Sequence, residues 1–249
     1  MQIDNISAIV TGAASGLGNA TAAALAARGA RVFGIDLDTT DAPTLENVTY
    51  VKADVTSEAE VRQAVALAAE AGPLRVVVNC AGIGPSARVL GRGGVHDLGL
   101  YRKVVEVNLI GTFTVLALAS EAIAATEQLE HGQRGVVINT ASVAAFEGQV
   151  GQVAYSSSKG GVVGLTLPAA RDLAQHGIRV NTIAPGIVET PMLATISEEF
   201  RAGLAEGVPF PKRLAQPADF AQLVTQLVEH DYINGETVRM DGALRMAPR

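Results

Sequence analysis

The sequence predicts one α/β domain built on a doubly wound parallel sheet with helices on both faces. Short runs of apolar and β-branched residues alternate along the 249 residues with Ala-rich stretches of high helix propensity. The strand-like runs are continuously apolar, which is typical of parallel strands buried on both faces. Neither a repeat nor a polar linker interrupts this alternation, so we expect a single domain over residues 1–249.

The expected elements follow one another in strand and helix order, which requires right-handed crossovers. Strands are predicted where β-branched apolar residues cluster, at 7–10, 31–35, 48–53, 75–79, 135–140, 178–184 and 236–240. Helices are predicted where Ala, Leu, Glu and Gln dominate between these runs, at 16–29, 57–71, 98–129, 153–176 and 217–229. The sheet therefore has seven strands. Pro168 lies inside one predicted helix and is expected to kink it.

Two irregular stretches break the alternation. Residues 83–97 ("IGPSARVLGRGGVHD") are Gly-rich and predict a surface loop, whereas residues 185–216 hold four prolines and a short helix near 197–206. Because loops that follow the carboxyl ends of parallel strands carry ligands, we expect both stretches at the functional edge of the sheet.

Composition excludes several classes of function. The net charge of −6 and the pI near 5.3 argue against a nucleic-acid surface, which needs a basic face. The single cysteine, Cys80, excludes an internal disulfide and a CxxC metal site, and we expect no metal. Residues 5–27 carry no charge, but the polar residues and glycines among them argue against a membrane-spanning helix. We therefore expect a soluble cytoplasmic protein that binds neither nucleic acid nor membrane.

The stretch "TGAASGLG" between the first expected strand and helix predicts a dinucleotide site. Its glycines, Gly12, Gly16 and Gly18, are spaced as in a variant of the Rossmann fingerprint, with Ser15 and Leu17 between them. Such a turn lets the backbone approach a pyrophosphate at the helix N-terminus. Glycines in a loop are often only turn residues, but this position in the chain favours binding and a Rossmann-type fold.

Asp36 at the end of the second expected strand indicates NAD(H) rather than NADP(H). A carboxylate there accepts hydrogen bonds from the adenosine ribose and repels a 2′-phosphate. A turn or capping aspartate is the alternative interpretation. Further cofactor contacts are expected where the third and fourth strands end, at Asp54, Val55, Asn79, Ala81 and Gly82; Asp54 has a turn residue as its alternative.

The stretch "YSSSK" places Tyr155 and Lys159 on one face of a predicted helix, about one turn apart. A single Tyr–Lys pair of this kind, without other functional groups around it, is usually a solvated surface feature. Upstream, a predicted strand ends at Ser142, and Asn108 lies inside a predicted helix. A phenol has a pKa near 10, and a neighbouring ammonium favours its ionised form. The pair is therefore a candidate general acid and base.

This ordered set resembles the short-chain dehydrogenase/reductase family, from "TGAASGLG" and "NCAG" through Asn108, Ser142 and "YSSSK" to "PG". The resemblance covers essentially the whole chain. It implies that Tyr155 is the acid/base, that Lys159 lowers its pKa together with the positive nicotinamide of NAD+, and that Lys159 binds the nicotinamide ribose. It also implies that Ser142 binds the substrate oxygen and Asn108 holds a water of a proton relay. Cofactor contacts are further implied at Pro185, Gly186, Val188 and Thr190.

Stretches of the second half, such as "LPAARDLAQHGIRVNTIAPG" and "INGETVRMDGALRM", resemble the NAD-dependent type II 3-hydroxyacyl-CoA dehydrogenases, also called 17β-hydroxysteroid dehydrogenase type 10. That resemblance implies interconversion of (S)-3-hydroxyacyl-CoA and 3-ketoacyl-CoA, a role in fatty acid metabolism, and a homotetramer. An acyl-CoA needs an apolar slot and a basic rim. Candidates for the substrate site are Gln149, Met192, Leu193, Phe200 and Leu204, and candidates for the rim are Arg88, Arg92, Lys212 and Arg213.

Three alternatives stay open. The chain could be another short-chain alcohol or hydroxysteroid dehydrogenase, or a 3-oxoacyl-acyl-carrier-protein reductase, although the latter usually prefers NADPH and Asp36 argues against it. Ordinary packing or solvated charge is the alternative for each substrate and rim residue. A non-catalytic NAD-binding scaffold is the alternative of another class, and the intact set of catalytic residues argues for an enzyme.

Overall fold

The predicted doubly wound parallel sheet is confirmed. The computed structural model describes residues 1–190 and 203–248, and its main sheet has the strand order β3-β2-β1-β4-β7-β8-β9 with every neighbouring pair parallel. The strands are β1 (Ser7–Thr11), β2 (Arg31–Asp36), β3 (Val48–Lys52), β4 (Leu74–Asn79), β7 (Gly135–Thr140), β8 (Ile178–Pro185) and β9 (Thr237–Met240). Their bounds lie within one or two residues of the expected ones.

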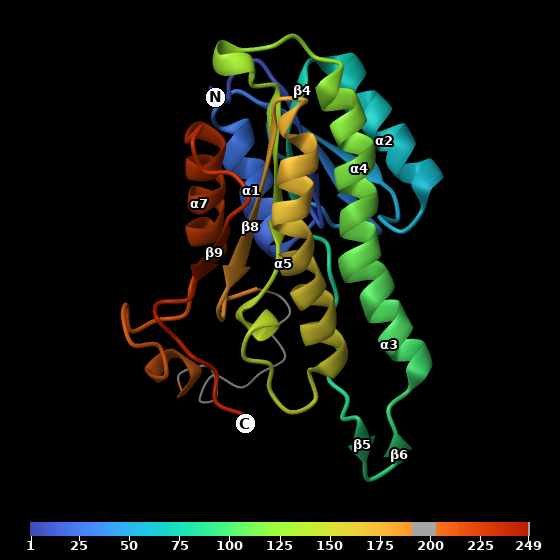
Figure 1. Cartoon of the computed structure of the whole chain (residues 1–249), viewed down its shortest axis with the longest axis vertical. Helices are drawn as coiled ribbons and strands as arrows, with labels where there is room; N and C mark the ends of the chain where they lie inside the picture. The colour runs from blue at the N-terminus through green and yellow to red at the C-terminus, as the bar shows by residue number, and fades with distance from the viewer. Residues whose placement is uncertain (191–202, 249) are drawn as a thin grey trace.

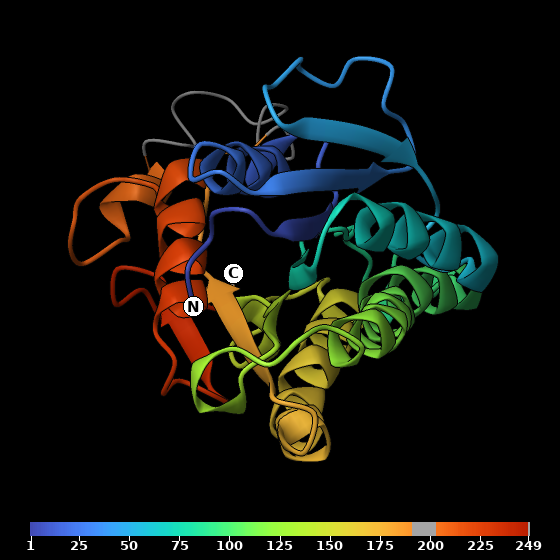
Figure 2. The same ribbon diagram turned by 90° about the horizontal axis from the view of Figure 1, so that it is seen from above.

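Helices cover both faces of this sheet (Figures 1 and 2). On one face α1 (Gly16–Ala26) packs against α7 (Pro217–Glu229), and on the other lie α2 (Glu58–Ala71), α4 (Thr112–Ala124) and α5 (Val153–Ala174). Figure 2 shows the two groups of helices on opposite sides of the strands. The three-layer architecture explains why the strand sequences are apolar on both faces.

Successive residues of a strand enter two different cores. In β4, Val76 and Val78 pack into the cluster that contains Phe220 of α7, whereas Val77 packs into the cluster that contains Val115 of α4. All of these side chains are buried. Since side chains alternate across a strand, a continuous apolar run is what this arrangement requires.

The helix expected at 98–129 is interrupted and shorter. It consists of α3 (Leu98–Val105), a π-helical turn (Glu106–Gly111) and α4, which ends at Ala124. By length and composition, Leu98–Ala124 could cross a membrane, but half of its most apolar window is buried inside the protein. Val104, Val115 and Ile123 are buried there in core contacts. Packing against the sheet accounts for the buried apolar residues of this stretch, whereas Leu98, Ile110 and Phe113 are exposed.

The irregular stretches are partly ordered into regular structure. Within the expected 83–97 loop, β5 (Leu90–Gly91) and β6 (Gly94–Val95) form a small antiparallel hairpin that projects from one end of the molecule (Figure 1). Of the expected helix at 197–206, only 203–206 lies within the described residues, and it is helical. Helix α5 continues through Pro168 to Ala174.

Candidate active site

A cavity of about 680 Å³ lies where the carboxyl ends of β1, β4, β7 and β8 meet. The strand order reverses between β1 and β4, and open α/β sheets bind ligands at such a switch point. Predicted cofactor residues that line the cavity are Gly12, Ser15, Gly16, Leu17, Gly18, Asp36, Asp54, Val55, Ala81, Gly82, Tyr155, Lys159, Pro185, Gly186, Val188 and Thr190. Tertiary structure thus gathers residues that are up to 178 positions apart, from Gly12 to Thr190.

The Gly-rich turn at the start of α1 leaves no room for a side chain at Gly12 or Gly18. A Cβ at Gly18 would lie 2.1 Å from the carbonyl oxygen of Gly12, and a Cβ at Gly12 would lie 2.9 Å from the amide nitrogen of Ala81. Gly12 also has a φ of +65°, which favours glycine. The hydroxyl of Thr11 accepts from the amides of Cys80 and Ala81, both at 3.1 Å, and joins the ends of β1 and β4. This close cradle at a helix N-terminus fits a pyrophosphate.

Asp36 faces the Gly-rich turn from the end of β2. Its Oδ2 accepts a hydrogen bond of 2.9 Å from the amide of Ala14, which leaves the other carboxylate oxygen available for a ligand. Asp54, after β3, accepts from the amide (2.9 Å) and the hydroxyl (2.7 Å) of Thr56. The Thr56 backbone hydrogen bond is the main reason that the pKa of Asp54 is lowered. Asp54 thus stabilises its own turn and also lines the cavity.

Ser142, Tyr155 and Lys159 line the cavity together. The hydroxyl of Ser142 accepts from the amide of Ala144 (3.1 Å) and caps the short 3-10 turn after β7. Burial raises the pKa of the Tyr155 phenol, and hydrogen bonding to Ser142 acts in the opposite direction. The chain by itself therefore keeps the phenol protonated at neutral pH.

The expectation that Lys159, together with the positive nicotinamide of NAD+, lowers the pKa of Tyr155 stays a prediction; in the chain by itself burial is the largest influence on that pKa. Nζ of Lys159 donates a 2.7 Å hydrogen bond to the carbonyl of Thr140 and lies 5.8 Å from the centre of the Tyr155 ring, over its face. Burial lowers the pKa of Lys159 to about 8. The opposing trends share one cause, because removal from water disfavours the charged form of each group.

Asn108 lies in the π-helical turn and does not line the cavity. Its side chain is fully buried; Oδ1 accepts from the amide of Ile83 (2.8 Å), and Nδ2 donates to the carbonyl of Ile83 (2.9 Å) and the hydroxyl of Ser158 (3.0 Å). The expected role of Asn108 in holding a relay water stays a prediction, and its side chain has these three hydrogen bonds within the protein. The side chain ties the segment after β4 to α5, the helix that carries Tyr155.

Asn79 also has a structural position rather than one at the cavity. It is almost fully buried, and its Nδ2 donates to Oδ1 of Asn139 at 2.9 Å, between the ends of β4 and β7. The small residues that follow it, Ala81 and Gly82, line the cavity instead. A Cβ at Gly82 would lie 3.1 Å from Oδ1 of Asn108, so a larger residue at position 82 would press on the Asn108 side chain.

The expected substrate residues are only partly described. Gln149 lines the cavity, and its Nε2 donates to the carbonyl of Ala247 at 3.0 Å. Leu204 is half-buried but is not among the described residues that line the cavity. Met192, Leu193 and Phe200 lie outside the described residues.

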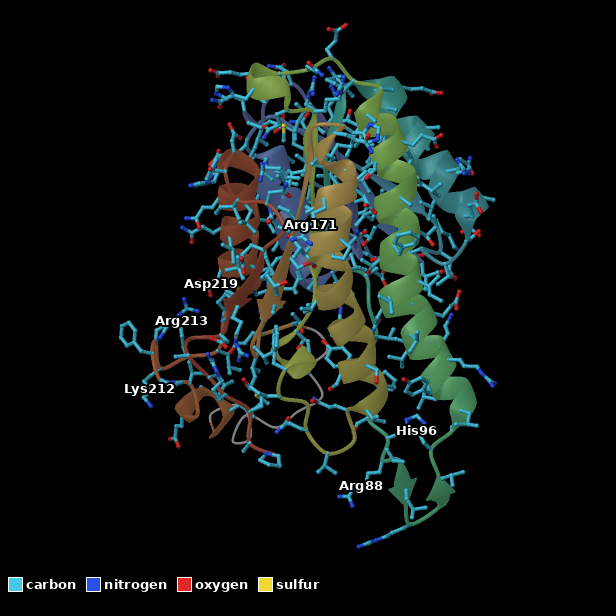
Figure 3. All side chains as sticks on the ribbon, viewed as in Figure 1. Arg88, His96, Arg171, Lys212, Arg213 and Asp219 are labelled. Atoms are coloured by element: carbon cyan, nitrogen blue, oxygen red, sulfur yellow. The ribbon has the colours of Figure 1, made fainter. Side chains whose placement is uncertain are left out.

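The four rim candidates do not form one basic patch. Arg213 makes a two-fold ion pair with Asp219 at 2.6 and 2.9 Å, and Lys212 donates to the carbonyl of Glu206 at 3.2 Å. Figure 3 shows Arg213 and Lys212 on one side of the molecule and Arg88 on the other, near the hairpin. Arg88 and Arg92 are exposed. Arg213 is thus committed to Asp219, and the basic residues of the hairpin are far from it.

Sequence reasoning missed several residues of the cavity, above all Met246 near the end of the chain. Ile83, Val143, Ala144, Val150 and Ile187 also line it. Ile187 lies between two predicted cofactor residues and Met246 ends the quoted stretch "INGETVRMDGALRM", but neither was singled out. Met246 reaches the cavity because the chain folds back after β9. Across residues 1–190 and 203–248, no group of three or more His, Cys, Asp or Glu side chains could hold a metal ion.

Comparison with known proteins agrees with this geometry. Residues 7–200 match the short chain dehydrogenase family. The chain belongs to the short-chain dehydrogenase family. Members of this family are oxidoreductases that use a nicotinamide cofactor, and the cradle at Gly12 and Gly18 with Asp36 beside it fits such a dinucleotide.

Two relatives within the short-chain dehydrogenase family are similar over almost their whole length. The chain is 50% identical over 254 residues to 3-hydroxyacyl-CoA dehydrogenase type-2 of Bos taurus, covering 99% of this chain and 97% of that protein. The corresponding Homo sapiens protein is 49% identical over the same shares. A crystal structure of 3-hydroxyacyl-CoA dehydrogenase type-2 from Mycobacterium avium has a TM-score of 0.95 at 44% identity, with 98% of each chain covered.

Proposed function

We propose that this protein uses NAD(H) to interconvert (S)-3-hydroxyacyl-CoA and 3-ketoacyl-CoA. The observation that carries the proposal is the identity of about half of all positions with 3-hydroxyacyl-CoA dehydrogenases type-2 over nearly the full length. Site geometry supports it, because Ser142, Tyr155 and Lys159 face the same cavity as the Gly-rich turn. An acid/base thus lies within one cavity with a place for a dinucleotide.

The residues of the chain divide the work between binding and proton transfer. The Gly-rich turn would hold the pyrophosphate, Asp36 the adenosine ribose, and Lys159 the nicotinamide ribose. When bound, the nicotinamide supplies or accepts the hydride. The hydroxyl of Ser142 positions the substrate oxygen.

Tyr155 exchanges the proton of that oxygen. Burial raises the pKa of Tyr155, so its phenol carries at neutral pH the proton that the reduction of a carbonyl requires. In the reverse direction the phenol must ionise first. A Lys159 ammonium and a cationic cofactor would both favour that ionisation.

The choice of NAD(H) over NADP(H) rests on Asp36. One of its oxygens accepts from the amide of Ala14, and the other is available for a ribose hydroxyl, which supports NAD(H). The next residue, Leu37, is 58% exposed and offers no positive charge to a 2′-phosphate. Comparison of KM for NADH and NADPH tests this choice, and a preference for NADPH would contradict it.

The substrate is tested by following NADH oxidation with three carbonyl compounds: acetoacetyl-CoA, acetoacetate and a ketosteroid. We expect turnover of acetoacetyl-CoA to exceed that of free acetoacetate. Turnover of the ketosteroid or another carbonyl compound without turnover of the CoA ester would overturn the substrate assignment. That result would favour an alcohol or hydroxysteroid dehydrogenase.

The variant Tyr155→Phe separates an enzyme from an NAD-binding scaffold. It removes the phenolic hydroxyl and keeps the ring, so turnover should fall by about 10²–10⁴-fold or more while NADH binding is retained. Near-full activity in this variant would refute the acid/base role. A homotetrameric assembly and a cytoplasmic location are expectations from the sequence; light scattering in solution would test the former.

A further inference from the structure

The loop at residues 146–152 is held between two other parts of the chain. It follows the 3-10 turn of Ser142 and leads directly into α5, which carries Tyr155. On one side the amide of Ala87 donates to the carbonyl of Gly151 at 2.8 Å. On the other side, the last described residues, 241–248, run along the loop. The position of this loop therefore depends on a segment that is almost 100 residues away in sequence.

Three hydrogen bonds join residues 241–248 to the 146–152 loop. The amide of Met246 donates to Oε2 of Glu147 (3.1 Å), the side chain of Gln149 donates to the carbonyl of Ala247 (3.0 Å), and the amide of Val150 donates to the carbonyl of Pro248 (3.0 Å). The bond between Val150 and Pro248 joins two backbone groups, and the other two involve the side chains of Glu147 and Gln149. Together, the three hydrogen bonds fix the position of the Met246 backbone beside the 146–152 loop.

A cluster of four charged side chains fastens the same segment. Arg239 donates to both oxygens of Glu147 at 2.9 and 3.1 Å and pairs with Asp241 at 2.7 Å, while Arg245 pairs with Asp241 at 2.9 Å and with Glu147 at 3.4 Å. Side-chain exposure is 24% for Glu147, 21% for Arg239 and 7% for Asp241. Two-fold, partly buried pairs of this kind hold geometry better than exposed single pairs.

The backbone is bent so that this contact can form. After β9, Gly242 and Ala243 have φ values of +58° and +67°, and the amide of Ala243 donates to Oδ1 of Asp241 at 3.0 Å. A Cβ at Gly242 would lie 2.6 Å from a methyl group of Val208. Left-handed backbone at a residue other than glycine is unfavourable and persists only where surrounding contacts impose it.

Met246 lies on this segment and lines the same cavity as Tyr155. Apolar residues that line the cavity with Met246 include Val143, Ala144, Val150 and Ile187. The Gly-rich turn and Asp36 belong to the cofactor half of the cavity. We assign Met246 to the other half, because its segment bonds to the loop that carries Gln149 and follows the turn of Ser142. An apolar side chain at this place would contact the carbon chain of a substrate rather than the dinucleotide.

We propose that Met246 is a specificity-determining residue that closes the substrate half of the cavity, and that Glu147 is a positioning residue that holds it there. This inference rests on the proposed function for the identity of the substrate. It assigns no chemical step to either residue. The proposal predicts that the size of the Met246 side chain determines which substrate lengths are accepted. It also predicts that the Glu147 carboxylate affects substrate binding without contacting the substrate.

The test measures kcat and KM for a series of 3-ketoacyl-CoA esters from acetoacetyl-CoA to long-chain homologues, and KM for NADH. Met246→Ala should change the ratio of kcat/KM between the long and short esters by about tenfold in favour of the long ones. Met246→Phe should change it in the opposite direction. If both variants leave the ratio within about twofold of the unaltered protein, the assignment of Met246 is wrong.

Glu147→Gln keeps the shape of the side chain and removes its charge. We expect KM for the acyl-CoA esters to rise about three- to tenfold, with the ratio of long to short esters shifted as in Met246→Ala, and with KM for NADH unchanged. The matched control is Glu58→Gln, which breaks an exposed pair with Arg62 on α2 and should change neither KM. A rise in both KM values, or no rise at all, would contradict the positioning role.

Failure of the proposed function would be recognised separately. If the unaltered protein does not reduce acetoacetyl-CoA but reduces another ketone, the proposed substrate is wrong, and the same variants are compared on ketones of that class with increasing size. The expected change in the size ratio is the same. A variant that fails to fold would be identified by circular dichroism, and the remaining Met246 variant would still decide the question.

Discussion

Replacement of Lys159 by methionine should stabilise the protein at neutral pH while abolishing its activity. Lys159 is only 4% exposed, and burial lowers its pKa from 10.5 to about 8. A shift of this size corresponds to about 3 kcal/mol of unfavourable free energy for the charged form in the folded state at pH 7. Loss of the hydrogen bond to the Thr140 carbonyl offsets about 1 kcal/mol. The net expected gain is about 2 kcal/mol in the free energy of unfolding.

The sign and pH range of this effect follow from the lowered pKa. Between about pH 8 and pH 10.5 the unfolded chain binds more protons at Lys159 than the folded chain does, so the unaltered protein gains stability as the pH rises. Methionine does not titrate, and the variant lacks this gain. The difference between the two proteins should therefore shrink by about 2 kcal/mol between pH 7 and pH 9.5.

Urea unfolding without cofactor, at both pH values and one protein concentration, measures the difference. Lys52→Met, at an exposed position on β3, is the matched control and should change stability by less than about 0.5 kcal/mol at either pH. If Lys159→Met is less stable than the unaltered protein at pH 7, or if the difference is the same at both pH values, the burial argument is refuted. The variant should have no measurable dehydrogenase activity.

Three further predictions concern the cofactor and the segment after β4. Gly18→Ala places a Cβ 2.1 Å from the carbonyl of Gly12 and should abolish NADH binding by calorimetry, whereas unchanged affinity would show that the turn can widen. Asp36→Ala should raise KM for NADH and shift the NADH-to-NADPH preference about tenfold toward NADPH; an unchanged preference would contradict its role. Asn108→Ala leaves the backbone groups of Ile83 unpaired and should cost about 2–4 kcal/mol of stability in urea unfolding, and a cost below about 1 kcal/mol would contradict this bracing role.

Much of the fold could be predicted because its signals are local. Apolar runs such as that of β4 mark buried strands, and the spacing of Gly12, Gly16 and Gly18 marks a turn whose backbone conformation glycine favours. Strand and helix alternation then leaves few possible topologies. The π-helical turn at Asn108 was not predicted, because its side chain bonds to Ile83 and Ser158, which are distant in sequence. The β5/β6 hairpin was not predicted either, because its two paired segments are only two residues long and lie in a Gly-rich stretch.

The residue types of the candidate site could also be predicted from the sequence, but the pKa shifts of these residues could not. The sequence placed Tyr155 and Lys159 one helical turn apart and suggested that the ammonium lowers the phenol pKa. That spacing did not predict the effect of burial, which in the chain by itself raises the pKa of Tyr155 and lowers that of Lys159. Burial is a property of the packed molecule, and no local pattern encodes it.

What the sequence by itself determined is the set of groups that the chemistry needs: the glycine turn, Asp36, Ser142, Tyr155 and Lys159. Their spacing along the chain is fixed by covalent geometry and helix periodicity, which act over a few residues. Tertiary structure alone decided that the Asn108 and Asn79 side chains brace the site rather than line it. It also brought Met246 to the cavity, through a turn after β9 and a charge cluster centred on Glu147. Those contacts join segments about 100 residues apart, and only the folded chain brings them together.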